Sequence, residues 1–392
     1  MTAHDTVISA LSALLHRFPD PAAVDRVAFL RAQYDLGLAW VHFAEDSGGL
    51  GIAAARQQEV TERLVGVGAP TPGSGDYVGM HQAAASISAF GTPEQKARFL
   101  PAIFTGVEQW CQLFSEPGAG SDLAGLATSA TRDGDQWIVS GQKVWTSGAH
   151  LADWGILVAR SDPDVPKHRG LTFFVCDMRL PGVQIRPLRQ ADGAAHFSEV
   201  FLDDVRLPDD LRIGDAGQGW AVALTGLHSE REGIGEALRT PWDDLVAAWS
   251  RYDAPNHDVE HAMRLRVVTC WMEARVLQLS QARLRAAQGR NGSTPLGSLQ
   301  KIAQSRVNQQ TSSLIVDLMG PQGLIGFDYD SMVHAPTGAA PPAQMQVIRS
   351  RANSIEGGTD EIQRNVIGEQ VLGLPGDVRV DKNIPWRSVP RS

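Results

Sequence analysis

The spacing of apolar residues changes twice along this chain of 392 residues, and that change constrains the fold more than any other feature. Up to about residue 108 apolar residues recur at three- and four-residue steps, as in Val7, Leu11, Leu14 and Phe18, which indicates amphipathic helices. From Trp110 to about residue 212, short stretches rich in β-branched and aromatic residues indicate strands. The helical spacing returns from about residue 217. We therefore predict an α+β chain in three parts, ordered helices, strands, helices.

The expected domains follow these changes. They are an N-terminal helical domain (1–108), a middle antiparallel β domain (109–212), a C-terminal four-helix-bundle domain (213–375) and a tail (376–392). The tail is rich in proline, and we expect it to be extended or disordered. Within these domains, Thr92-Pro93 is expected to open a helix over 91–106, and Asp133-Gly134 predicts a hairpin turn.

Composition excludes several classes of protein. The net charge of −9 is spread along the chain, and no basic stripe indicates a nucleic-acid partner. Three distant cysteines do not form a zinc motif or a disulfide framework. The N-terminal stripe lacks a basic region before it, so it does not predict a signal peptide, and no apolar run reaches the roughly 20 residues that span a membrane. We expect a cytoplasmic protein, and the isolated histidines His81, His196 and His228 predict no metal site.

Two stretches of the β region carry candidate chemistry. In WCQLFSEPGAGSD (110–122), glycines beside hydroxyls follow a predicted strand, so backbone N–H groups could approach a phosphate. In GQKVWTS (141–147), a tryptophan stands beside two hydroxyls, which suits stacking on a planar cofactor. Taken singly, each stretch has a simpler interpretation, namely a glycine-rich turn and a core tryptophan.

Taken together with GGTDEIQ (357–363), the two stretches follow an ordered pattern that resembles the acyl-CoA dehydrogenase family. The resemblance covers nearly the whole chain and includes GTPEQKARFLP before the first motif and VIGEQVLGLP after the last. That family's fold has the same order of helices, strands and helices. The resemblance implies FAD as cofactor, an acyl-CoA thioester as substrate and a trans-2-enoyl-CoA as product. It also implies electron-transfer flavoprotein as acceptor, and a homodimer or homotetramer, with a heterotetramer as the alternative.

The resemblance assigns cofactor residues by position. Phe114 and Ser115 are expected at the flavin ring through backbone and hydroxyl, and Trp145 and Ser147 against the isoalloxazine. Thr359 and Glu361 match positions that contact FAD phosphate or adenine, although some family members have glutamine in place of Glu361. Gly320 matches the turn that helps to hold a neighbouring subunit's FAD. Ser121 is expected near both the pyrophosphate and the CoA arm.

The catalytic base has two candidate positions. Many members carry a glutamate directly before Gly-Thr, but Gly357 stands there in SIEGGTDEIQR, and Glu356 is one residue early. In extended backbone a one-residue shift turns a side chain to the other face, so Glu356 is interpreted as a substrate-side bystander. A second branch of the family uses a glutamate directly before an arginine on a later helix. Glu230-Arg231 fits that pattern, and a helical wheel places Arg231 inside an apolar stripe with Glu230 on its flank.

We therefore predict Glu230 as base, the backbone of Gly357 as a donor to the thioester carbonyl, and Arg231 as a substrate-side residue. One departure concerns an Arg-x-x-Phe-Gly stretch that in many members reaches a neighbouring subunit's FAD. It is not recognisable near 285–298, where Arg290 is the only candidate substitute. Two alternatives stay open, a non-catalytic flavin-binding subunit of a heteromeric dehydrogenase and an acyl-CoA oxidase or flavin monooxygenase.

Overall fold

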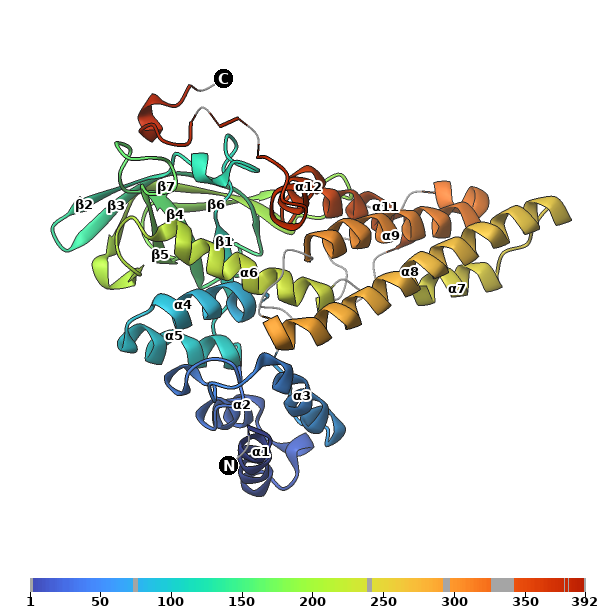
Figure 1. Cartoon of the computed structure of the whole chain (residues 1–392), viewed down its shortest axis with the longest axis horizontal. Helices are drawn as coiled ribbons and strands as arrows, with labels where there is room; N and C mark the ends of the chain where they lie inside the picture. Colours follow the sequence, from blue (N-terminus) through green and yellow to red (C-terminus); the bar gives the residue numbers. More distant parts are fainter. Residues whose placement is uncertain are drawn as a thin grey trace. The chain divides into compact units, whose positions relative to one another are not determined.

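The computed structural model describes residues 3–72, 77–237, 242–291, 297–325, 342–376, 378–379 and 381–390 (Figure 1). The chain divides into two compact units. Unit 1 comprises Met1–Leu188, His196–Glu230 and Arg379–Ser392, and unit 2 comprises Arg189–Ala195 and Arg231–Val378. None of the helices in the described ranges combines the length and apolarity needed to cross a membrane.

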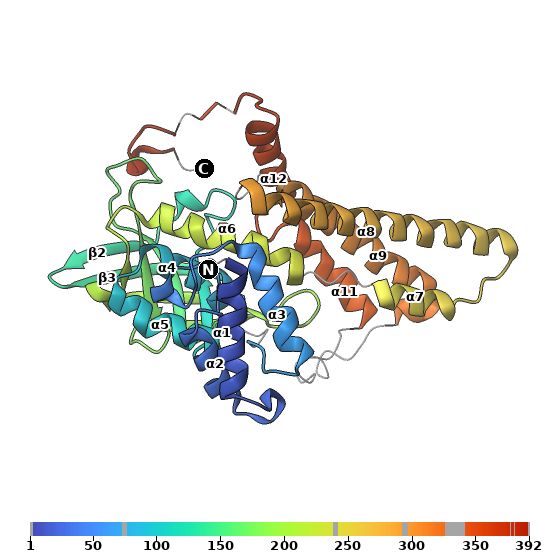
Figure 2. The same ribbon diagram turned by 60° about the horizontal axis from the view of Figure 1, so that its bottom comes forward.

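Helices fill the first part of unit 1, as the apolar spacing predicts. Their bounds are α1 Ala3–Arg17, α2 Arg26–Asp35, α3 Gln57–Gly66, α4 Ala84–Phe90 and α5 Pro93–Thr105, with a π-helical turn at Val78–Ala83 directly before α4. The predicted start of α5 is confirmed by two reciprocal hydrogen bonds. The Thr92 hydroxyl accepts from the Gln95 N–H, and the Gln95 side-chain oxygen accepts from the Thr92 N–H. Figures 1 and 2 both place α4 and α5 side by side.

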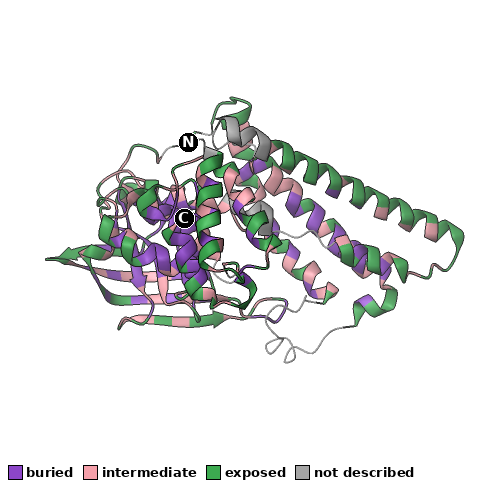
Figure 3. Ribbon diagram, turned by 90° about the horizontal axis from the view of Figure 1, so that it is seen from below, coloured by how far each residue is buried: buried purple, intermediate pink, exposed green. Residues whose placement is uncertain are grey.

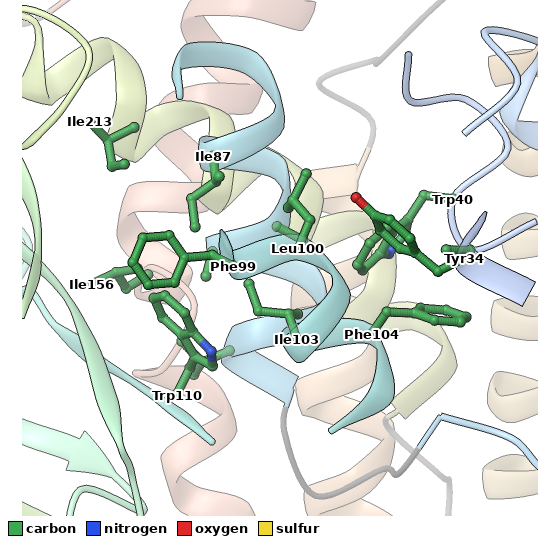
Figure 4. Close-up of a cluster of buried hydrophobic side chains, with 14 of the residues drawn as sticks. Tyr34, Trp40, Ile87, Phe99, Leu100, Ile103, Phe104, Trp110, Ile156 and Ile213 are labelled. Atoms are coloured by element: carbon green, nitrogen blue, oxygen red, sulfur yellow. The ribbon is translucent and has the colours of Figure 1, made fainter. Parts of the chain in front are cut away.

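A continuous apolar core joins these helices to the strands that follow. Helix α5 supplies Phe99, Leu100, Ile103 and Phe104, and Figure 4 shows them between two sets of side chains. On one side lie Trp110, Ile156 and Ile213 from the sheet; on the other lie Tyr34 and Trp40. Each fully buried side chain of this size contributes about 1.5–3 kcal/mol. Helix α5 therefore helps to fix the N-terminal helices on the sheet.

The described residues from 110 to 213 form one sheet of eight strands. The strands are β1 Trp110–Leu113, β2 Ser129–Asp133, β3 Gln136–Ser147, β4 Trp154–Arg160, β5 Leu171–Asp177, β6 Val183–Leu188, β7 Phe197–Pro208 and β8 Arg212–Ile213. Their order is β6-β7-β3-β2-β4-β5-β8, and β1 pairs with β4. The pairs are antiparallel, as predicted, except that β1 and a single position of β2 pair parallel to β4.

The hairpin predicted at Asp133-Gly134 is confirmed. Asp133 pairs with Gln136 at the end of the β2–β3 ladder, and Gly134 has φ 65°, a left-handed conformation that glycine adopts without a Cβ clash. The mixed fold of helices and sheet that the apolar spacing predicts is thereby present in unit 1.

The described tail residues 381–390 lie against the sheet of unit 1 (Figure 1). The Trp386 N–H donates to the Val165 carbonyl, the Trp386 indole N–H donates to the Gly125 carbonyl at 3.1 Å, and the Arg160 guanidinium stands 4.1 Å above the indole ring. Lys167 pairs with both Asp122 and Asp381. We call residues 381–390 the strap. Disorder, one of our two expectations for the tail, is wrong here, because these contacts hold the strap in place.

Helices dominate unit 2. Their bounds are α7 Trp242–Ser250, α8 His257–Asn291, α9 Gly297–Leu318, α11 Ala343–Ser350 and α12 Asp360–Val366. Helix α6, Gly219–Ala237, begins in unit 1 and continues into unit 2. Helix α9 packs against α7, α8, α11 and α12, and Figures 1 and 2 show it alongside α8. Buried Leu314, Ile315 and Leu318 of α9 form its contact with α7 and α8.

Candidate active site

The end of β3 presents a tryptophan outward. Regular strand alternation would place Lys143 and Trp145 on the same face, since their positions differ by two. A β-bulge between Lys143 and Thr146 breaks that alternation, and Trp145 adopts φ 61°. As a result Lys143 is fully buried while Trp145 is 60% exposed and makes an edge contact with the Phe197 ring. Ser147 is exposed as well. The bulge thus turns the two predicted flavin residues of this strand toward solvent.

The end of β1 lies beside this bulge. Phe114 is buried, and its ring packs against Phe173, so only its backbone can contact a ligand. Ser115 is half-buried, and its carbonyl accepts a hydrogen bond from the Val144 N–H. The prediction that Phe114 acts through its backbone fits this burial. The contact between Ser115 and Val144 brings the two sequence motifs together at adjacent strand ends.

The glycine-rich loop that follows leaves room for a ligand. A Cβ added at Gly118 or Gly120 would meet no atom of the described residues within 4 Å, so packing among those residues does not explain the absence of side chains there. Ser121 is exposed on the same loop. The next residue, Asp122, is held by Lys167 at 2.8 Å. Open glycines beside exposed hydroxyls suit the approach of a phosphate to the backbone.

Glu230 lies on the face of α6 that packs against the helices before it. Val222, Gly226 and Glu230 follow one another at four-residue steps and so share a face. Val222 and Gly226 are buried, and the Val222 carbonyl accepts a hydrogen bond from the Ser86 hydroxyl. The Glu230 carbonyl accepts a hydrogen bond of 2.8 Å from the Tyr77 hydroxyl. Glu230 is therefore half-buried on this packed face, whereas the sequence places it on the flank of a different apolar stripe.

The carboxylate of Glu356 in unit 2 is already engaged. It accepts hydrogen bonds from Arg349 at 2.8 Å and from the Asn353 amide at 2.6 Å. The two residues after it, Gly357 and Gly358, have φ 64° and 87°, which is backbone that other residues rarely adopt. The Gly357 carbonyl accepts from the Gln363 side chain. This geometry gives Glu356 a structural role and orients the turn that follows it.

The other predicted residues of unit 2 lie in three places. Thr359 caps α12, because its hydroxyl oxygen accepts from the Ile362 N–H. Glu361 extends from the first turn of α12 and pairs with Arg364 on the same helix. Gly320 has φ 58° at the end of α9, and an added Cβ would meet open space. The side chains of Arg231 and Arg290 lie outside the described residues, so their predicted roles stay predictions.

Comparison with known proteins decides the family. Three domain profiles match almost end to end: acyl-CoA dehydrogenase N-terminal domain over 13–107, middle domain over 111–205 and C-terminal domain over 217–372. The chain belongs to the acyl-CoA dehydrogenase family. It is 36% identical over 348 residues to acyl-CoA dehydrogenase IpdE1 of Mycobacterium tuberculosis, covering 88% of this chain and 86% of that protein. It is 37% identical over 362 residues to FadE34 of the same organism, covering 90% of this chain but 48% of the larger protein.

Solved structures share the fold. One titled "Tcur3481-Tcur3483 steroid ACAD" aligns with a TM-score of 0.71 at 23% identity, covering 95% of this chain and 98% of the other. The predicted family and fold class are confirmed. The chain is thus an enzyme of the acyl-CoA dehydrogenase class, and FAD is the cofactor of that class.

The described residues of this acyl-CoA dehydrogenase fit FAD. An exposed indole, two hydroxyls and the open Gly118 and Gly120 lie at the strand ends of one unit, which is the kind of surface that a planar ring and its phosphates require. Sequence reasoning missed three residues: Lys143 and Trp386, which contact this region, and Tyr77, which contacts Glu230. Lys143 lies within the motif GQKVWTS. No motif surrounds Tyr77, and Trp386 lies in the tail. Only Lys143 carried a signal, as a cation two residues before Trp145 in a predicted strand.

Proposed function

We propose that this enzyme oxidises an acyl-CoA thioester to the trans-2-enoyl-CoA, with Glu230 as the catalytic base. The observation that carries the proposal is the position of Glu230. It is half-buried on the packed face of α6, and its carbonyl is held by Tyr77. The other candidate, Glu356, is held at the start of its turn by Arg349 and Asn353. Gly357 leaves the other position without a side chain.

The reaction removes two hydrogens from adjacent carbons. Glu230 would take the α-proton as the Cα–H bond breaks, while the β-hydrogen leaves as hydride and the electron pair forms the new double bond. When bound, FAD supplies the hydride acceptor. The thioester carbonyl must be polarised for the α-proton to become acidic, so a donor at that oxygen acts together with the base. We assign this donor to the Gly357 N–H, for which no hydrogen bond to another described residue is present.

The cofactor residues proposed here follow the order of the family motifs. In unit 1, Trp145 and Ser147 would lie against the flavin ring, with Ser115 and the Phe114 backbone at its edge and Ser121 toward the pyrophosphate and the CoA arm. In unit 2, Thr359 and Glu361 would meet the phosphate or adenine, and Gly320 would meet the FAD of a neighbouring subunit. Their support is the exposure of Trp145, Ser147, Ser121 and Glu361 together with the order of the family motifs.

Anaerobic titration of the purified, FAD-loaded enzyme with acyl-CoA thioesters tests the proposal. We expect loss of flavin absorbance when a competent substrate is added to the wild-type enzyme. Glu230→Gln should bind the acyl-CoA with unchanged affinity but show no loss of flavin absorbance. Glu356→Gln is the matched control, since it removes a carboxylate of the same type and should keep a near-normal rate of bleaching. If the flavin is reduced at a normal rate in Glu230→Gln, or if only Glu356→Gln loses flavin reduction, then Glu230 is not the base.

The substrate panel should span straight, branched and bulky acyl groups. Because a solved protein with this fold is titled a steroid acyl-CoA dehydrogenase, a steroid side-chain thioester belongs in it. Electron-transfer flavoprotein is the proposed electron acceptor. Reoxidation of the reduced enzyme by that protein, with slow reoxidation in air, is the expected result. Rapid peroxide formation would instead indicate an oxidase.

We further propose that the enzyme is a homodimer or homotetramer that uses helix α8. Large apolar side chains stand exposed along it at three- and four-residue steps: Leu265, Val268, Met272, Val276 and Leu279. We call these five residues the α8 stripe; Figure 3 shows how much of α8 is exposed along its length. The opposite side of α8 is already occupied, since Ala274 and Leu277 pack on α9. A second apolar stripe on one helix supports a partner helix there, by the same packing rule as a coiled coil.

Light scattering after size-exclusion chromatography tests this assembly. Val276→Glu should shift the wild-type oligomer to smaller species, because it places a charge in the α8 stripe. Gln278→Glu adds the same charge outside the stripe and should leave the mass unchanged. A wild-type monomer would contradict the homo-oligomer, and a stable mass only on co-expression with a second family member would point to a heteromer.

A further inference from the structure

A fully buried lysine lies directly behind the proposed flavin surface. Lys143 of β3 is 0% exposed, and its ammonium group uses all three donors. It donates to the Phe114 carbonyl, to the Val158 carbonyl and to the Glu116 carboxylate, each at 2.9 Å. These bonds join β3 to the end of β1 and to the middle of β4. A lysine is almost never buried so completely unless its charge is paired.

The paired carboxylate organises the loop in front of it. Glu116 accepts from the Ala127 N–H at 2.7 Å and from the Thr128 N–H at 2.9 Å, where the chain enters β2. Its own backbone closes a turn with Ala119. Burial alone would raise the pKa of Glu116, but Lys143 and these hydrogen bonds together lower it, so the carboxylate is ionised. One ion pair therefore connects both ends of the loop from residue 116 to residue 128.

The same pair fixes the residues that are proposed to meet the flavin. The carbonyls of Phe114 and Ser115 both accept from β3, the first from the Lys143 ammonium group and the second from the Val144 N–H. Immediately after these donors the backbone turns through the bulge at Trp145, in a left-handed conformation that is unfavourable for a tryptophan. Such a conformation persists only where its surroundings hold it. The buried side of β3 supplies that support through Lys143.

We propose that Lys143 and Glu116 are positioning residues for FAD. They hold the end of β1, the glycine-rich loop and the Trp145 bulge in the one arrangement that the isoalloxazine ring fits, without touching it themselves. The inference rests on the flavin surface proposed above. A competing interpretation gives the pair a role in stability alone. The two differ in what they predict for FAD affinity and flavin electronics in variants that still fold.

Lys143→Met is the first variant, because methionine has a similar length and no charge. Glu116→Gln is the second. Full-length apoprotein is prepared for each, folding is checked by circular dichroism and thermal unfolding, and FAD is titrated with its fluorescence as readout. We expect folded variants to bind FAD about tenfold or more weakly, and to show an altered flavin midpoint potential and visible spectrum, because the strand end and the loop lose a group that holds them in place.

Trp137→Phe is the matched control for lost stability. It removes the indole bond to Asp209 at the far end of β3, in the same sheet. It should lower the unfolding temperature while leaving FAD affinity, potential and spectrum unchanged. Wild-type FAD affinity and an unchanged potential in a folded Lys143→Met would overturn the proposal.

Single variants leave one buried charge without its partner, which can prevent folding. The double variant Lys143→Met/Glu116→Gln removes both charges and keeps the test available. We expect it to fold and still bind FAD weakly, since the Phe114 carbonyl stays without its donor. Full recovery of affinity in the double variant would contradict positioning. Failure of the wild-type protein to bind FAD at all would instead refute the flavin surface itself, so the two failures are distinguishable.

Discussion

The Tyr77 hydroxyl donates a 2.8 Å hydrogen bond to the backbone carbonyl of Glu230. Tyr77 stands directly before the π-helical turn Val78–Ala83, and its ring packs against His81 at 4.6 Å. Burial lowers the pKa of His81 below its ordinary value, so its ring is held neutral beside Tyr77. π-Helical turns are rare in proteins as a whole, but those that occur are often at functional sites. Here one places a hydroxyl on the residue that we propose as base.

Tyr77→Phe removes only that hydroxyl. If Glu230 is the base, we expect kcat to fall by about fivefold, the equivalent of one hydrogen bond of about 1 kcal/mol, with KM and FAD affinity unchanged. Stopped-flow bleaching of the flavin measures this step directly. The pH dependence of the bleaching rate should also differ between Tyr77→Phe and wild type. Tyr34→Phe removes a hydroxyl from the core of the same unit and should leave kcat as it is. Equal rates for Tyr77→Phe and wild type would show that Glu230 needs no such anchor.

Close packing of α6 makes a second prediction, for Gly226→Ala. Alanine favours a helix over glycine by about 1 kcal/mol, but here its Cβ would lie 2.9 Å from the Ser86 hydroxyl and 3.1 Å from the Gln82 carbonyl. We expect the crowding to win and the free energy of unfolding to fall by about 1–3 kcal/mol. Gly66→Ala, where an added Cβ meets nothing within 4 Å, should instead gain up to about 1 kcal/mol. Urea unfolding compares them; two stabilised variants would disprove the crowding.

The strap gives a third prediction. Trp386→Ala removes a cation–π contact with Arg160 and a hydrogen bond to Gly125, so we expect a loss of about 1–3 kcal/mol in the free energy of unfolding. Arg387→Ala, next in the chain, removes only a solvent-exposed pair with Asp164 and should lose less than about 1 kcal/mol. Equal losses for both variants would mean that the indole is not the anchor.

Acid stability gives a fourth prediction, at Asp209. Hydrogen bonds from Arg212 lower the pKa of this carboxyl from 3.8 to about 2; burial opposes them and the Trp137 indole adds to them. A group whose folded pKa is lowered contributes stability above its unfolded value and loses it as the pH falls toward the folded value. Asp209→Asn should therefore be less stable than wild type at pH 5–7, and the difference should shrink between about pH 4 and pH 2. Thermal unfolding across this range measures it.

Asp210→Asn, on the exposed neighbour, is the control for Asp209. It should unfold at nearly the wild-type temperature throughout the range. If the unfolding temperatures of Asp209→Asn and wild type differed by the same amount at every pH, the charge of the carboxylate would not be the cause of the difference.

Local signals in the sequence predicted local structure well. The capping box at Thr92 and Gln95 and the turn at Asp133-Gly134 depend on residues a few positions apart, and both are present as predicted. The order of helices and strands followed from apolar spacing for the same reason. What the sequence could not supply were pairings across long separations, such as Tyr77 with Glu230 or Gly125 with Trp386. Nothing in the residues around Trp386 indicates which carbonyl its indole will reach.

The site shows the same division. The motifs identified Trp145 and Ser147 as flavin candidates from their residue types. Strand alternation alone, however, would bury Trp145 together with Lys143. The bulge that separates them is set by pairing with β7, at a register shift that no local pattern announces. Likewise the helical wheel places Glu230 on the flank of the apolar stripe that contains Arg231, whereas the close packing of α6 runs through Val222 and Gly226. Partners in space, rather than periodicity, decided which face was covered.

The strap also orders events during synthesis. Unit 1 takes its first residues from the start of the chain and its last from Arg379–Ser392, with most of unit 2 encoded between them. A ribosome releases the chain from its N-terminus, and domains fold as they emerge. The sheet can therefore form early, but Lys167 and Gly125 gain their strap partners only after all of unit 2 has been translated. A nascent chain stalled before Trp386 should carry a folded sheet whose glycine-rich loop is still open to proteolysis.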